Sequence, residues 1–160
     1  MTFYSEVIAK DPRFHSTAIC HDLALLEPVT RQNVLNIIAD ARALGITLTP
    51  FETYRSKERQ LMLFEQKATK LKTVGVHHYG LACDLPKLIA GEESWKGDFR
   101  FLVKLCKARS MISGIDWGQP KIKHTFVDGC HVQRITTARQ ARLFAGTWYP
   151  DASYDPYRDG

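Results

Sequence analysis

The clearest pattern along the chain is a run of apolar residues at helical spacing in its first third. Apolar side chains stand at i, i+3, i+4 and i+7, and so form one stripe on a helix with Thr30 as N-cap and Gly45 as the stop. The stripe consists of Val34, Ile37, Ile38, Ala41 and Leu44. The sequence therefore predicts a helix over 30–44.

A second helix is predicted over about 57–66. Ser56 stands immediately before it and can accept a hydrogen bond from the first turn. Leu61 and Phe64 are three residues apart, which puts them on one face of this helix and predicts that both are buried.

The remaining elements mix helices and strands without an internal repeat. Ser94 is the predicted cap of a helix that runs to about 109. Further helices are predicted over 16–26 and from Thr136 or Thr137 to 144, strands over 46–49, 81–85, 114–118 and 131–134, and irregular segments over 1–16, 67–76, 86–93 and the tail. This order indicates the α+β class, and 160 residues are most economically a single domain, 1–160.

The chain is moderately basic, with a net charge of +5 and a pI of about 9.1. This charge admits a polyanionic partner such as nucleic acid, a membrane surface or an anionic cell wall. Lys67, Lys70 and Lys72 crowd together, but no aromatic residue stands among them to stack on bases. A basic enzyme is therefore favoured over a nucleic-acid binder.

The four cysteines show no C-x-x-C spacing, and the N-terminal residues lack the apolar core of a secretory signal. No uninterrupted apolar run is long enough to cross a bilayer. We therefore expect reduced thiols, synthesis in the cytoplasm and no stable insertion into a membrane.

The chemistry concentrates in the stretch Gly75–Leu85, where His77, Gly80, Ala82 and Asp84 form an H-x-x-G-x-A-x-D pattern. His131, much later in the chain, is the predicted third partner. Two histidines and one carboxylate suit Zn²⁺, and three protein ligands leave a fourth position for water, as in catalytic zinc sites.

The alternation of side chains along strands tests this metal site against a rival. If 81–85 and 131–134 are strands, Asp84 lies on the same face as Ala82, and His131 lies on the same face as Gln133. Cys83 and Cys130 then fall on the opposite, apolar faces. This parity argues against a structural zinc site built from two cysteines and two histidines.

Two further residues have predicted catalytic roles. Asp128 precedes His131 by three residues and is the predicted general base, which takes a proton from water and passes it to a leaving amine. Arg55, at the junction between the strand over 46–49 and the helix over 57–66, is predicted to stabilise an oxyanion. Taken singly, each residue also has an ordinary structural explanation, and spacing alone leaves both interpretations open.

These residues resemble the D-Ala-D-Ala carboxypeptidase and L-alanyl-D-glutamate endopeptidase family of zinc peptidases, relatives of the Hedgehog signalling domain. The motifs that carry the resemblance are E-T-Y-R-S-x-x-R-Q at 52–60, H-x-x-G-x-A-x-D at 77–84, W-G at 117–118 and D-x-x-H-x-Q at 128–133. It implies a small antiparallel sheet with helices packed around it, and peptidoglycan stem peptides as substrates. The site residues it implies are His77, Asp84 and His131 as zinc ligands, Asp128 as base, Arg55 at the substrate carbonyl, and Tyr54, Gln60, His78, Trp117 and Gln133 as substrate-binding positions. From an extended backbone alone, His78 points away from His77, and a structural role for it is then favoured.

Within this family the chain is more similar to phage endolysins that cut L-Ala-D-Glu. The carboxypeptidases that remove terminal D-Ala more often have Glu as base, whereas Asp128 stands here. The resemblance then implies a monomer that waits in the cytoplasm until release and acts on the periplasmic cell wall. Gly75 replaces a usual Ser, which bears on bond specificity more than on zinc. Gln119 and Pro120 stand where an aromatic often follows the W-G pair.

Two alternatives remain at this stage. One is a D,D-carboxypeptidase that removes terminal D-Ala. The other is a metal-bearing cell-wall binding module without hydrolysis. Retention of Asp128 and Arg55, which a binding module does not need, favours the enzyme.

Overall fold

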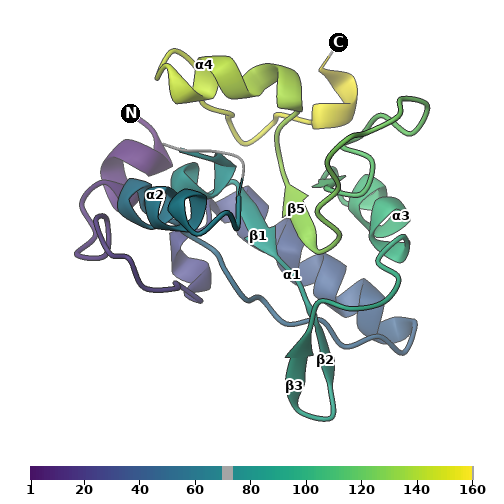
Figure 1. Cartoon of the computed structure of the whole chain (residues 1–160). Helices are drawn as coiled ribbons and strands as arrows, with labels where there is room; N and C mark the ends of the chain where they lie inside the picture. Colours follow the sequence, from purple (N-terminus) through teal and green to yellow (C-terminus); the bar gives the residue numbers. More distant parts are fainter. Residues whose placement is uncertain (70–73, 160) are drawn as a thin grey trace.

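The computed structural model describes residues 1–69 and 74–159. This part of the chain has a three-stranded antiparallel sheet in the order β1-β5-β4, a separate hairpin of β2 and β3, and four α-helices (Figure 1). The strands are β1 (Ala82–Asp84), β2 (Lys87–Ile89), β3 (Glu92–Ser94), β4 (Ile112–Ser113) and β5 (His131–Gln133). The helices are α1 (Pro28–Ala43), α2 (Lys57–Glu65), α3 (Phe101–Ala108) and α4 (Gln140–Phe144), and short helical turns form at Tyr4–Ile8, Leu23–Leu25, Val76–Tyr79, Thr137–Arg139 and Pro156–Arg158. The predicted α+β class is confirmed.

Helices α1 and α3 cover one face of the three-stranded sheet. The main core joins Val34, Ile37 and Ala41 of α1 and Leu102 and Cys106 of α3 to Cys83, Leu85, Cys130 and Val132 from the sheet region. The alternation predicted for the strands around Asp84 and His131 is confirmed, because Cys83 and Cys130 both point into this core. The opposite face of the same strands is left for Asp84 and His131.

Helix α1 begins differently from the prediction. Pro28 is its first residue, and the Glu27 carboxylate caps it by accepting from the backbone N–H of Val29 at 3.0 Å and of Thr30 at 2.9 Å. Proline suits the first position of a helix because its missing N–H has no intrahelical partner there. The prediction of Thr30 as N-cap is therefore wrong, whereas Gly45 has a φ of +82° just beyond the helix end, as predicted.

Helix α2 has the predicted cap but not the predicted buried face. The Ser56 hydroxyl accepts from the Arg59 backbone N–H at 2.9 Å. Leu61 and Phe64 are 38% and 37% exposed, whereas Arg59 and Gln60 are buried. The polar side of this helix faces inward, so the prediction that Leu61 and Phe64 are buried is wrong.

The segment 86–100 differs most from the expected pattern. The predicted loop over 86–93 is the hairpin of β2 and β3, whose turn places Ala90 and Gly91 at φ values of +52° and +82°. Ser94 ends β3, so it cannot cap a helix, and α3 begins only at Phe101. Two successive residues with positive φ fit a tight hairpin turn, and only Gly91 signalled it in the sequence.

Three shorter predictions also fail. Of the helix over 16–26 only the turn Leu23–Leu25 forms, and the strand over 46–49 is reduced to one bridge between Leu48 and Lys87. The strand over 114–118 is replaced by β4 and a following turn in which Trp117 has a φ of +53°. A positive φ is incompatible with an extended strand. The predicted basic loop over 67–76 includes Lys70 and Lys72, which lie outside the described residues.

Both ends of the chain pack against the domain where irregular segments were expected. Ile8, in the turn Tyr4–Ile8, is fully buried. Arg134 is also fully buried, pairs with Glu27 at 3.2 Å and donates to the carbonyl oxygens of Asp151 and Tyr154. These bonds hold the C-terminal segment close to the start of α1.

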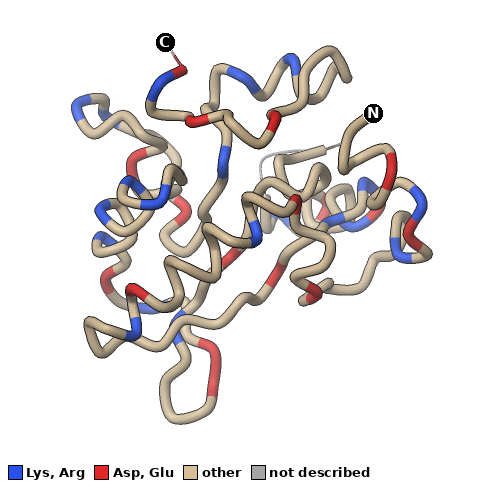
Figure 2. The backbone as a smooth tube through the Cα atoms, turned by 180° about the vertical axis from the view of Figure 1, so that it is seen from behind, with Lys and Arg blue, Asp and Glu red and all other residues tan. Residues whose placement is uncertain are grey.

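The charges that give the protein its net +5 are spread over many segments. Figure 2 shows Lys and Arg positions interspersed with Asp and Glu positions along the backbone. None of the helices within 1–69 and 74–159 combines the length and the apolarity needed to span a bilayer.

Candidate metal centre and substrate cleft

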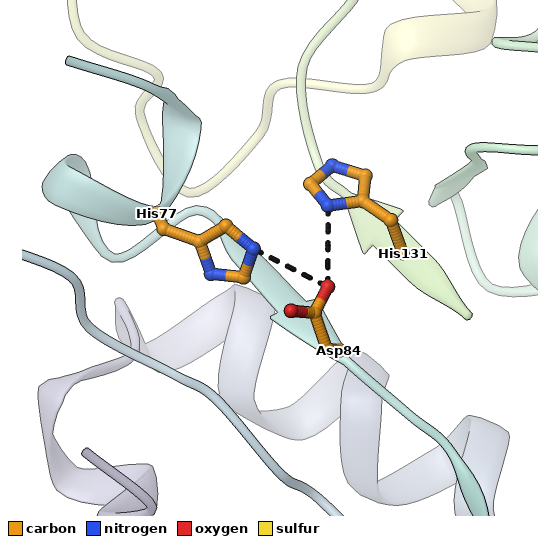
Figure 3. Close-up of side chains that lie close together, drawn as sticks. All are labelled: His77, Asp84 and His131. Carbon is orange, nitrogen blue, oxygen red and sulfur yellow. Dashed lines mark ion pairs between the residues drawn. The ribbon is translucent and has the colours of Figure 1, made fainter. Parts of the chain in front are cut away.

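Two consecutive elements, the turn Val76–Tyr79 and β1, and the distant strand β5 bring His77, Asp84 and His131 together (Figure 3). His77 lies in the turn Val76–Tyr79, and the antiparallel register of β1 and β5 sets Asp84 directly opposite His131. Asp84 Oδ1 is 3.4 Å from His77 Nε2 and 3.5 Å from His131 Nδ1. The structure thus assembles the three residues predicted as metal ligands.

The second nitrogen of each imidazole is held by the protein. His77 Nδ1 is 3.0 Å from the Thr53 carbonyl oxygen, which can only accept, so Nδ1 carries the proton and Nε2 offers a lone pair. His131 Nε2 is 2.8 Å from Gln133 Oε1, and the Gln133 amide nitrogen donates to the Ile135 carbonyl at 2.8 Å. The second bond fixes the amide orientation, so His131 donates through Nε2 and its Nδ1 lone pair faces Asp84. Such partners orient ligating histidines in metal sites.

The charge at this point suits a divalent cation. Asp84 Oδ1 is buried and has no hydrogen-bond partner. Burial raises the pKa of Asp84, but positive charge on the neighbouring imidazoles outweighs burial and holds that pKa well below its ordinary value. In the neutral tautomers described above, lone pairs of all three side chains face one point, where a cation takes the place of that positive charge. An ionised carboxylate oxygen without a donor, facing two imidazole nitrogens, is a donor set that fits Zn²⁺.

A second candidate metal site consists of Asp84, Asp128 and Cys130. The Cys130 Sγ lies within 4.8 Å of carboxylate oxygens of the two aspartates. Burial raises the pKa of the Cys130 thiol far above its ordinary value. Because the thiolate is the form that binds metals, the pair of histidines is the better ligand set.

Asp128 lies at the edge of the same site. Its backbone N–H donates to the Gly114 carbonyl at 2.9 Å, and Gly114 N–H in turn donates to the His131 carbonyl at 2.8 Å. A Cβ at Gly114 would stand 2.3 Å from the Asp128 carbonyl oxygen. Only glycine at 114 therefore allows the Asp128 backbone to lie so close to the residue that bonds to His131.

Arg55 reaches the site from the segment before α2. Its Nη2 is 2.8 Å from Glu52 Oε1 and 3.7 Å from Asp84 Oδ2, and its side chain is 14% exposed. Glu52 also accepts from Arg59 Nε at 2.5 Å. Burial alone raises the pKa of Glu52, but Arg55 is the main group that outweighs it, and the pKa is lowered. This acid was not predicted as a site residue; its position at the head of the E-T-Y-R-S run was the available signal.

A cavity of about 440 Å³ opens over these groups. Trp117 forms part of its wall, with the indole N–H donating to the Phe126 carbonyl at 2.9 Å and the ring 5.3 Å from that of His131. Other predicted site residues that line the cavity are Arg55, Gln60, His77, Asp128, His131 and Gln133. The side-chain amide of Gln133 is hydrogen-bonded to His131 and to the Ile135 carbonyl, so this residue orients His131, a candidate metal ligand.

Tyr54 and His78, predicted as substrate-binding positions, do not line this cavity. Each is 2% exposed. The Tyr54 hydroxyl donates to the Phe14 carbonyl at 2.6 Å, and His78 Nε2 accepts from the Tyr4 hydroxyl at 2.7 Å. Burial lowers the pKa of His78 to about 4. Both side chains are committed to bonds inside the protein, and there they brace the segments that carry Arg55 and His77.

Comparison with known proteins gives similarity in structure only. No protein-family model matches the sequence, and no curated protein matches it. The L-Ala D-Glu endopeptidase ChiX of Serratia marcescens superposes with a TM-score of 0.56 and 22% identity, over 73% of this chain and 84% of that one. The vancomycin resistance D,D-pentapeptidase VanY of a VanB-type cassette, solved with Zn(II), gives a TM-score of 0.53 and 14% identity, over 75% and 78% of the two chains.

The chain shares the fold of these peptidases. The L,D-carboxypeptidase DacB of Streptococcus pneumoniae has this fold too, with a TM-score of 0.53 and 14% identity over 77% of this chain and 73% of that one. These three proteins have one fold but are named for the cleavage of three different kinds of peptide bond. The shared fold therefore assigns no bond specificity to this chain.

Proposed function

We propose that this protein is a zinc-dependent peptidoglycan peptidase that hydrolyses the L-Ala-D-Glu bond of the stem peptide. The observation that carries the proposal is the convergence of His77, Asp84 and His131 beside a cavity that His77, His131, Asp128 and Arg55 line. The fold shared with peptidases, one of them solved with Zn(II), supports it.

In this proposal each residue has a separate role. His77, Asp84 and His131 would hold the zinc ion, which would supply a Lewis acid able to activate water at neutral pH. Asp128 accepts a proton from the attacking water and returns it to the leaving amine. Arg55, fixed by Glu52, donates to the substrate carbonyl oxygen as negative charge develops on it.

The bond assignment rests on two lines of support. The base is Asp128 and the E-T-Y-R-S run is complete, a combination that resembles L-Ala-D-Glu endopeptidases. A structure of similar fold, ChiX, is an endopeptidase of that specificity. The alternative for this chain is removal of terminal D-Ala, which would correspond to the D,D-peptidase activity named for VanY.

Digestion of purified sacculi, with mass spectrometry of the released muropeptides, tests the bond assignment. We expect new N-terminal D-Glu ends and glycan strands that keep L-Ala. Release of free D-alanine without those ends would reject the endopeptidase and support a D,D-carboxypeptidase.

The role of Asp128 is tested by Asp128→Ala, which should retain one zinc ion and lose roughly 10²- to 10⁴-fold in turnover. Asp98→Ala removes an exposed carboxylate that pairs with Arg100 and serves as the matched control, with activity unchanged. Wild-type turnover in the Asp128 variant would exclude it as the base.

The metal is tested by removal. Dialysis against a chelator should abolish hydrolysis, and added Zn²⁺ should restore it, because the ligand set provides the Lewis acid site. His131→Ala should bind less than one equivalent of zinc, as measured by elemental analysis, and full hydrolysis by metal-free protein would contradict the proposal.

We further propose a biological setting, in which the protein is a monomeric phage endolysin that is stored in the cytoplasm and reaches the cell wall on release. The endolysin-like motifs and the basic pI, which favours adsorption to an anionic wall, support this setting. Expression in bacteria should cause lysis only after the inner membrane is permeabilised, which turbidity records. Lysis without permeabilisation would contradict it.

A further inference from the structure

A second cavity, of about 620 Å³, lies beside the first. The two share Trp117, Gln119 and Thr137 as lining residues, so they are neighbouring parts of one surface depression. The second cavity is also lined by the turn Thr137–Arg139 and by Pro156 and Tyr157 near the C-terminus. Figure 1 shows α4 and the C-terminal turn above β5, at the end of the strand away from the hairpin.

Two aromatic rings are held rigidly at this second cavity. Trp117 is fixed by its bond to the Phe126 carbonyl, and its ring stacks on that of Phe126. The Tyr157 hydroxyl donates to the Met111 carbonyl at 2.8 Å, while 39% of the residue stays exposed. Rigid, partly exposed rings offer flat apolar contact at low entropic cost.

The polar groups at the second cavity supply both donors and acceptors. Arg139 and Asp159 form a two-bond ion pair, at 2.7 and 2.8 Å, that cancels their charges. Arg142 has no ion pair among the described residues. Flat rings combined with fixed polar groups and one additional cation suit a neutral, polyhydroxylated ligand better than a polyanion.

We propose that this second cavity binds the amino sugar of the glycan strand to which the stem peptide is attached. The inference rests on the proposed function: L-Ala is amide-linked to the lactyl group of that sugar, so cleavage of L-Ala-D-Glu sets the sugar one residue from the reacting carbonyl. A cavity that shares Trp117, Gln119 and Thr137 with the first cavity adjoins it directly, as a sugar only one residue away requires. For a D,D-carboxypeptidase the sugar would lie several residues further away, at about 3.3–3.6 Å per residue.

The test compares two substrates: the stem peptide joined to its disaccharide, and the same peptide without sugar. We expect wild-type protein to have a kcat/KM that is several-fold higher on the first, because contacts with the sugar add to transition-state binding. The readout is the ratio of the two kcat/KM values. A ratio is insensitive to partial misfolding, which lowers both values together.

Two variants change the cavity itself. Arg142→Ala removes the free cation and should lower the ratio roughly two- to tenfold, as expected for one or two lost hydrogen bonds. Ala138→Leu fills the cavity from an exposed position in the turn Thr137–Arg139 and should bring the ratio close to one.

Arg158→Ala is the matched control. It removes the same charge from a side chain that is 88% exposed and does not line the second cavity, so it should leave the ratio unchanged.

Three outcomes would overturn the inference. The first is a wild-type protein with equal kcat/KM values on the two substrates. The second is an unchanged ratio in both cavity variants. Either outcome would leave the proposed endopeptidase function intact. Failure to cut L-Ala-D-Glu in either substrate would reject the proposed function, and with it this inference.

Discussion

Gln133 shows at the residue scale how a metal ligand is held in place. It accepts from His131 Nε2 and donates to the Ile135 carbonyl, both at 2.8 Å, and is 1% exposed. The family resemblance implied contact of Gln133 with substrate, and strand parity puts the residue on the same face as His131. In the structure Gln133 lines the first cavity and its amide is hydrogen-bonded so that it selects the tautomer of His131.

Gln133→Leu should therefore weaken zinc binding about 10- to 100-fold, since the His131 ring loses the acceptor that fixes it. Competition with a chromophoric chelator measures the affinity. Gln140→Leu, at another residue of the same cavity, is the control and should bind zinc as the wild type does. Equal affinities in the two variants would show that the bond does not orient the ligand.

Glu52 is a second residue whose importance comes from its partners. Its carboxylate contacts Arg55 at 2.8 Å and Arg59 at 2.5 Å, and the side chain is 6% exposed. Removal of this charge would leave two buried guanidinium groups without a full counter-charge, which is costly in a low-dielectric interior.

Glu52→Gln should lower the free energy of unfolding by roughly 3–5 kcal/mol and displace Arg55 from the site. Denaturant unfolding gives the first effect, and a fall in kcat the second. Asp40→Asn breaks the more exposed pair with Arg109 and should cost less than about 1 kcal/mol. A cost for Glu52→Gln as small as that of Asp40→Asn would contradict this assignment.

At the scale of elements, the turn from Val76–Tyr79 into β1 decides whether His77 and Asp84 face each other. Gly80 has a φ of +71°, and a Cβ there would stand 2.7 Å from the Leu25 carbonyl oxygen and from Ile8 Cδ1. The H-x-x-G-x-A-x-D pattern required a small residue at this turn. The structure adds that the N-terminal segment, expected to be irregular, closes over it.

Gly80→Ala should destabilise the fold by roughly 2–4 kcal/mol, because it combines the strain of positive φ with backbone overlap. Gly91→Ala separates the two causes: φ is +82° there, but nothing lies within 4 Å of the added Cβ. It should cost only about 1–2 kcal/mol. Equal losses in denaturant unfolding would show that the close approach to Leu25 contributes nothing.

At the scale of the whole molecule, Arg134 connects the end of the sheet, the start of α1 and the C-terminal segment. It pairs with Glu27 and bonds to two carbonyl oxygens of the tail while fully buried. The tail in turn supplies Tyr157 and Asp159 to the second cavity.

Arg134→Met should cost roughly 3–5 kcal/mol, since Glu27 would then be buried without its partner. It should also expose the tail to limited proteolysis. Arg158→Met, which breaks an exposed contact of 3.7 Å with Asp155, should change stability by less than about 0.5 kcal/mol. A tail that stays resistant in the Arg134 variant would contradict its anchoring role.

Local patterns predicted α1, the start of α2 and the strands that bear Asp84 and His131, but not the turn Val76–Tyr79 that bears His77. The stripe of α1, the Ser56 cap of α2 and the alternation in β1 and β5 depend on helical and strand periods, which are properties of neighbouring residues. For the same reason the faces of Asp84 and His131 followed from the sequence. The hairpin of β2 and β3 and the late start of α3 did not, because short strands with little alternation are stabilised by their pairing and not by propensity.

The sequence by itself determined the α+β class and the residue types capable of holding zinc. The class follows from the helical and strand periodicity of apolar residues, and the candidate ligands follow from short sequence motifs. Tertiary structure alone decided that Glu52 holds Arg55, that Tyr54 and His78 are used inside the protein, and that a second cavity adjoins the first. The physical reason is that a buried polar group must find its partner, and that partner comes from whichever distant segment the packing brings near.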